Sequence, residues 1–141
     1  MIYWASNILV SIFTAVIMPR YSNANNDTIQ TMSEFNFPLM LLNTVILVPI
    51  TEEVMYRGIL FGTLDRTNRW LAYIASVLVF SAIHVVGYIG SDTSLTWIAI
   101  SLLQYIPASI CLAWTYAETD SIFTPTLIHA TINLVAMLSM R

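Results

Sequence analysis

The sequence predicts an all-α protein that crosses a membrane several times as a bundle of helices. Hydrophobic residues make up 57% of the 141-residue chain and charged residues only 9%, whereas soluble domains carry roughly 25% charged residues. A soluble domain of this size leaves too much surface in water to hide so large an apolar fraction. The apolar residues also gather in long runs. Together these observations predict one polytopic transmembrane domain over residues 1–141.

Five apolar runs separated by short polar connectors form the expected spans. A helix needs about 20 residues to cross the hydrocarbon core of a bilayer. We expect the helices at Met1–Met18, Pro38–Leu64, Trp70–Ile89, Leu95–Ala117 and Ile122–Met140. The segment Arg20–Phe37 is polar and rich in Asn, and we expect it to form a loop. Neither a repeat nor a second domain is visible in the sequence.

The charges and the single cysteine exclude several kinds of partner. The formal net charge is −3, and the five basic residues, all Arg, are scattered along the chain, so we expect no nucleic-acid partner. One cysteine, Cys111, permits neither an internal disulfide nor a cysteine metal cluster. It lies in an apolar run, where a buried small hydrophobic side chain is expected. The apolar composition predicts instead that the lipid bilayer surrounds the protein.

Three ionisable residues lie inside the second apolar run. Glu52 and Glu53 are adjacent, Arg57 follows four residues after Glu53, and the preceding segment Pro38–Ile50 carries no charge. Glu53 and Arg57 are spaced to pair along one helix face, which leaves Glu52 without a cation nearby in the sequence. Ionisable groups at membrane depth are costly and usually mark a functional site.

Polar residues on three different runs are expected to lie at the same depth. Short connectors make consecutive spans antiparallel, so depth can be counted from one face at a rise of 1.5 Å per residue. On this scale Glu52 lies roughly 18 Å and His84 roughly 21 Å from that face. His129 lies roughly 12 Å and Asn133 roughly 18 Å from it, and their spacing of four places both on one helix face. We therefore expect a polar cavity between the second, third and fifth helices.

The ordered motifs in these runs resemble those of the CPBP family of intramembrane proteases. The motifs are Glu52-Glu53-x-x-x-Arg57, Phe80-x-x-x-His84 and His129-x-x-x-Asn133. The family includes the CAAX prenyl proteases and the bacterial bacteriocin-processing and immunity (Abi) proteins. The resemblance covers residues 38–139, which we take as the protease core. Related proteins usually carry additional helices before the first motif, so this chain is either a minimal member or a fragment.

The resemblance implies a role for each motif residue. Glu52 would be the base that activates a water, assisted by His84. His129 and Asn133 would donate hydrogen bonds to the oxyanion that forms on the scissile carbonyl. Peptide hydrolysis requires both an activated water and donors aimed at the developing charge. The implied reaction is hydrolysis of a membrane-associated peptide, such as a prenylated CAAX tail or a bacteriocin leader, in a bacterial cell membrane.

The resemblance also implies a supporting pair and raises the question of a metal. Glu53 and Arg57 would support the site rather than react. Members of the family are called metalloproteases, and Glu52, His84 and His129 are the kind of open three-ligand set that catalytic zinc uses. The same residues also suit a metal-free mechanism that depends on glutamate. We expect no tightly bound metal, with zinc as the alternative.

Two other functions are compatible with the same residues. A non-catalytic member of the family would serve in bacteriocin immunity or as a scaffold, with the polar cluster kept for structure. A proton or cation carrier would also place Glu and His inside a membrane. Against a carrier, the sequence has no inverted repeat and no matching pair of broken helices. The fourth run contributes no motif residue, and Gln104 or Tyr105 could line the cavity.

Overall fold

The computed structural model describes residues 2–90 and 92–140, and all regular secondary structure within them is helical. The elements are α1 Ile2–Ile17, α2 Ala24–Phe35, α3 Phe37–Leu42, η1 Asn43–Leu47, α4 Val48–Glu53, η2 Val54–Phe61, α5 Gly62–Asp65, α6 Arg69–Val86, α7 Leu95–Thr119 and α8 Phe123–Ser139. The η elements are π-helical. The predicted all-α membrane bundle is confirmed.

Three of the five expected spans are long and apolar enough to cross a bilayer. The elements α3 to α5 form one continuous helix of 29 residues, and α6 and α7 have 18 and 25 residues. The other two expected spans fold as shorter apolar helices, α1 with 16 residues and α8 with 17. At 1.5 Å per residue, α8 is about 26 Å long, which is less than the roughly 30 Å of the hydrocarbon core. Three candidate full-length spans and two shorter apolar helices thus make up the predicted helical membrane bundle.

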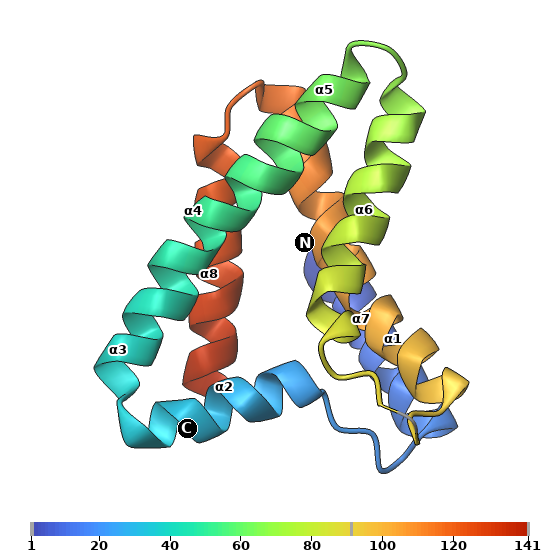
Figure 1. Cartoon of the computed structure of the whole chain (residues 1–141), viewed down its shortest axis with the longest axis vertical. Helices are drawn as coiled ribbons and strands as arrows, with labels where there is room; N and C mark the ends of the chain where they lie inside the picture. The colour runs from blue at the N-terminus through green and yellow to red at the C-terminus, as the bar shows by residue number, and fades with distance from the viewer. Residues whose placement is uncertain (1, 91, 141) are drawn as a thin grey trace.

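The helices form two layers that meet at one end and separate toward the other (Figure 1). One layer consists of the continuous helix from α3 to α5 together with α8, and the other consists of α6, α7 and α1. The layers meet near α5 and the turn between α7 and α8. At the opposite end α2 lies across the space between them. This wedge leaves room between the layers for the site described below.

The segment between α1 and α3 is a helix and not the loop that the sequence predicted. The side chain of Asn23 accepts a hydrogen bond from the backbone N–H of Asn26, which caps the first turn of α2. At the other end the backbone N–H of Asn36 bonds the carbonyl of Met32. No residue of α2 is buried. The segment is polar on average, which is why its composition indicated a loop.

The distribution of polarity is the reverse of that in a soluble protein. Glu53 and Arg57 have no exposed surface, whereas Val16 and Trp70 are 72% and 77% exposed. Large apolar side chains on the outside of the bundle suit contact with lipid tails, and buried charges require partners inside it.

Small side chains lie between α6 and α7. Ala72 and Ser76 of α6, and Ser109 and Ala113 of α7, are all buried and are spaced by four residues on each helix. Such small-xxx-small faces let the backbones of membrane helices approach closely. Ala72 and Ala113 belong to one buried cluster with Phe61 of η2. Close packing here joins the first layer to the second beside the charged residues.

Candidate active site

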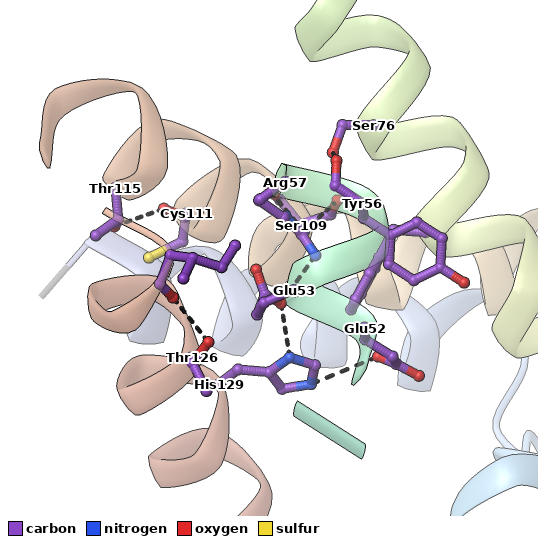
Figure 2. Close-up of polar contacts among 12 residues, drawn as sticks. Glu52, Glu53, Tyr56, Arg57, Ser76, Ser109, Cys111, Thr115, Thr126 and His129 are labelled. Atoms are coloured by element: carbon purple, nitrogen blue, oxygen red, sulfur yellow. Dashed lines mark hydrogen bonds and ion pairs between the residues drawn. The ribbon is translucent and has the colours of Figure 1, made fainter. Parts of the chain in front are cut away.

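Glu53 links two side chains, those of Arg57 and His129, across the bundle. Its Oε1 lies 2.9 Å from Nη1 of Arg57 on the next helical turn and 2.8 Å from Nδ1 of His129 on α8. Figure 2 shows the Glu53 carboxylate between these two partners. Glu53 and Arg57 side chains are fully buried. A buried carboxylate is stable only when paired and hydrogen-bonded, and here the pair the sequence predicted is formed.

Arg57 is held by a second helix as well. Its Nη2 lies 3.1 Å from the hydroxyl oxygen of Ser109 and 3.3 Å from the carbonyl oxygen of the same residue. The guanidinium carbon lies 4.5 Å from the ring centre of Phe80, in range of a cation–π contact. The contact between Ser109 and Arg57 could not be predicted from the sequence, because an isolated serine in an apolar helix is common. Arg57 thus contacts both α6, through Phe80, and α7, through Ser109.

Glu52 points to the opposite side and faces two imidazoles. Oε1 of Glu52 lies 3.7 Å from Nε2 of His84, and Oε2 lies 3.8 Å from Nε2 of His129. The His129 ring lies between the carboxylates of Glu52 and Glu53 (Figure 2). The side chain of Glu52 is 20% exposed, more than that of either histidine. Glu52, His84 and His129 thus lie close together, as their depths along the helices predicted.

The hydrogen bonds of both imidazoles define which nitrogen faces Glu52. Nδ1 of His84 lies 2.8 Å from the carbonyl oxygen of Phe80, so this nitrogen carries the hydrogen and donates it. Nδ1 of His129 donates to Glu53 in the same way. In each neutral ring Nε2 therefore presents a lone pair toward Glu52. The two gaps, 3.7 and 3.8 Å, are longer than a direct hydrogen bond.

Asn133 binds the backbone of the first layer. Its Nδ2 donates to the carbonyl oxygen of Thr44 at 2.9 Å. In the π-helical turn η1 the N–H of Val48 bonds the carbonyl of Asn43, five residues back. By the same pattern the carbonyl of Thr44 would need the N–H of Pro49, which proline lacks. The Asn133 amide supplies the missing donor, and it still holds a second hydrogen.

A cavity of about 850 Å³ opens beside this cluster. The four residues predicted to be catalytic all line it, namely Glu52, His84, His129 and Asn133. Residues from α1, α2 and α7 complete the lining, including Gln104 and Tyr105. The Glu53–Arg57 pair is buried behind Glu52. A peptide that entered the cavity would meet Glu52 and the two imidazoles together.

The site does not have the geometry of a zinc centre. Two ligands at 2.0–2.1 Å from a tetrahedral zinc lie about 3.3 Å apart, less than the distances of 3.7 and 3.8 Å between Glu52 and the two imidazoles. Throughout residues 2–90 and 92–140, no three His, Cys, Asp or Glu side chains converge closely enough to hold one ion. The arrangement as it stands does not fit the metal that the family name implies.

Cys111 takes no part in the cluster. It is a free thiol on α7, partly buried and not fully buried as the sequence suggested. Its backbone carbonyl accepts a hydrogen bond from the Thr115 hydroxyl at 2.8 Å. In Figure 2 the thiol lies apart from both carboxylates. The nucleophile for any hydrolysis at this site must come from elsewhere.

Comparison with known proteins identifies the family of the chain. The family model for type II CAAX prenyl endopeptidases, Rce1-like, matches residues 34–135. The matched region contains all of the predicted site residues. The chain belongs to this family, whose members are intramembrane proteases, and it is an integral membrane protein.

Curated bacterial proteins are also similar to the chain. The UPF0177 protein YbdI of Lactococcus lactis is 28% identical over 83% of this chain and 56% of its own length. A Bacillus subtilis protein named "putative membrane peptidase YdiL" is 32% identical over 68% of this chain and 35% of its own length. The chain thus spans between about a third and somewhat over half of these relatives. No solved structure matches it.

Proposed function

We propose that the protein is an intramembrane endopeptidase that hydrolyses a peptide bond with a water activated by Glu52. The observation that carries the proposal is the position of Glu52, which faces both His84 and His129 at the wall of a cavity. A carboxylate with two imidazoles around it can accept, share and return a proton. Membership of a protease family supports the same reaction.

In the first step a water attacks the carbonyl carbon of the scissile peptide. Glu52 accepts one proton of this water while the new carbon–oxygen bond forms. Nε2 of His84 accepts the hydrogen bond from the other proton, since its Nδ1 hydrogen is engaged with Phe80. Two acceptors on one water orient its remaining lone pair toward the substrate. Orientation of this kind contributes a large share of catalysis in enzymes.

In the second step the oxyanion is stabilised and the tetrahedral intermediate collapses. Nε2 of His129 can donate a hydrogen bond to the oxyanion when both nitrogens of the ring carry hydrogen. The second amide hydrogen of Asn133 can add another bond. The carbon–nitrogen bond then breaks, and the proton held by Glu52 passes to the leaving amine. Donors placed in advance at a developing charge are worth about 10²–10³-fold each.

We propose further that this reaction needs no tightly bound metal. Within residues 2–90 and 92–140, no three His, Cys, Asp or Glu side chains converge closely enough to hold one ion, which supports this proposal. The substrate would be a peptide that reaches the cavity from the bilayer of a bacterial cell membrane. Prenylated CAAX-type peptides and bacteriocin leaders are the two classes that fit the resemblance.

The test is cleavage of a peptide panel by the purified protein in lipid nanodiscs. The panel contains a prenylated CAAX-type peptide, its unprenylated form, a bacteriocin leader and a scrambled leader, and mass spectrometry locates the cut. We expect one peptide to be cut at one bond, with and without a chelator. Loss of cleavage on chelation with recovery on added zinc would contradict the metal-free form. If no peptide is cut and expression still protects cells from a bacteriocin, the non-catalytic role would replace the proposal.

A further inference from the structure

The imidazole of His84 lies against an aromatic ring from a helix that carries no family motif. Tyr105 of α7 stacks on it with ring centres 4.5 Å apart and an angle of 28° between the planes. On its own helix His84 contacts the ring of Phe80, with centres 4.7 Å apart. His84 is thus in contact with two aromatic rings. The hydrogen bond from Nδ1 to the Phe80 carbonyl also orients the imidazole.

Tyr105 is itself fixed by the segment that leads into α2. Its hydroxyl donates to Oδ1 of Asn23 at 3.0 Å. Nδ2 of Asn23 donates in turn to Oε1 of Gln104 at 2.9 Å. The same Oδ1 of Asn23 caps the first turn of α2 by accepting from Asn26. Asn23 therefore joins the start of α2 to the turn of α7 that carries Tyr105.

A second bond supports the same junction. The hydroxyl of Tyr21 lies 3.0 Å from that of Ser101, one turn earlier on α7. The segment before α2 thus contacts α7 through side chains of both Tyr21 and Asn23. Tyr105 also packs against the buried cluster of Tyr56, Phe80 and Leu112. Its ring is held at the hydroxyl and along its edge, which makes it a rigid surface for the imidazole.

We propose that Tyr105 is a positioning residue whose ring holds the His84 imidazole with Nε2 directed at Glu52. The inference rests on the proposed hydrolysis at Glu52. The imidazole has two faces, and the motif in which His84 lies supplies an aromatic contact from Phe80 alone. Catalytic groups must be held within a fraction of an ångström of productive geometry, and their supporting neighbours decide this. Loss of the ring would therefore lower turnover without weakening substrate binding.

The kinetic test compares variants of Tyr105 on whichever peptide the protein cleaves. Tyr105→Leu removes the ring, and we expect kcat to fall about tenfold with KM unchanged. Tyr105→Phe keeps the ring and loses only the bond to Asn23, so most of kcat should return. Trp114→Leu, on the lipid-exposed face of the same helix, is the matched control and should leave both constants unaltered. A rise in KM with kcat unchanged would assign Tyr105 to substrate binding and overturn the proposal.

A spectroscopic readout tests the same placement without any activity. The chain contains only two histidines, His84 and His129, so imidazole carbon–proton resonances give two sets of signals, assigned with His84→Gln. A stacked ring shifts the His84 signals upfield by its ring current. We expect Tyr105→Leu to remove this shift, Tyr105→Phe to keep it, and His129 to respond little. His84 signals unaffected by Tyr105→Leu would overturn the proposal.

The two readouts also separate this inference from the proposed function. If the unaltered protein cleaves no peptide, the hydrolysis fails, and the ring-current shift alone decides whether Tyr105 fixes His84. If the protein is active and Tyr105→Leu retains full kcat, hydrolysis stands and the positioning role is contradicted. A loss of kcat that Tyr105→Phe does not restore would also contradict it, because the ring would then not be the feature that matters.

Discussion

His129 donates its Nδ1 hydrogen to Glu53, with 2.8 Å between nitrogen and Oε1, and this bond joins α8 to α4. The same Oε1 accepts from Arg57. Glu53 therefore orients the imidazole while it neutralises the buried guanidinium. The adjacent Glu52 is left free of Arg57 hydrogen bonds and faces the cavity. The two neighbouring carboxylates thus divide into one that supports the site and one available for chemistry.

Glu53→Gln should destabilise the protein strongly. The change leaves Arg57 buried without its ionic partner, and breaking a buried pair from one side costs about 3 kcal/mol or more. The apparent free energy of unfolding, measured by SDS titration in mixed micelles, should fall by about that amount.

The matched control for this change is Asp65→Asn. Asp65 pairs with Arg69 at the same spacing of four residues, but the pair lies at the surface, where ion pairs contribute little. We expect almost no change in unfolding there. Equal effects of the two substitutions would show that burial of the Glu53–Arg57 pair has no energetic consequence.

Asn133→Ala should leave the Thr44 carbonyl in the π-helical turn without a hydrogen-bond donor. The Thr44 carbonyl would lose its bond, at a cost of roughly 1 kcal/mol in unfolding free energy. Pro49→Ala restores a backbone N–H to this turn, so it should recover part of the loss when combined with Asn133→Ala. Strictly additive effects in this double-mutant cycle would mean that the Asn133 amide does not take the place of the N–H that Pro49 lacks.

His129→Gln should reduce turnover more than Asn133→Ala does. His129 contacts both carboxylates, whereas one hydrogen of the Asn133 amide is already engaged with Thr44. We expect kcat to fall about 10²–10³-fold for His129→Gln and by a smaller factor for Asn133→Ala. Circular dichroism and size exclusion would check that both variants fold. A larger loss for Asn133→Ala would reverse the assignment of the principal oxyanion donor.

The sequence predicted that Glu52, His84 and His129 converge, because depth along a membrane helix follows from counting residues. Glu52, His84 and His129 lie at depths set by rise per residue and by short connectors, so their convergence was accessible without coordinates. The pairing of Glu53 with Arg57 followed from their spacing of four. These features depend on one helix at a time or on the order of helices.

What could not be predicted depends on contacts between distant segments. Asn23 and Tyr105 are 82 residues apart in the chain, and nothing local in either segment indicates the other. The segment that forms α2 is polar on average, so its composition indicated a loop. The bond from Asn133 to Thr44 depends on the π-helical turn Asn43–Leu47. The sequence of this segment has no pattern that predicts such a turn.

The most direct test of the account is the rate of peptide cleavage by Glu52→Gln in nanodiscs. The substitution keeps the shape of the side chain and removes its ability to take a proton from water. Glu118→Gln, near the end of α7 and outside the cavity, is the control. We expect Glu52→Gln to fold normally and to cleave the peptide at least about a hundredfold more slowly. The control, Glu118→Gln, should retain full activity. Cleavage by Glu52→Gln at the rate of the unaltered protein would contradict the central claim.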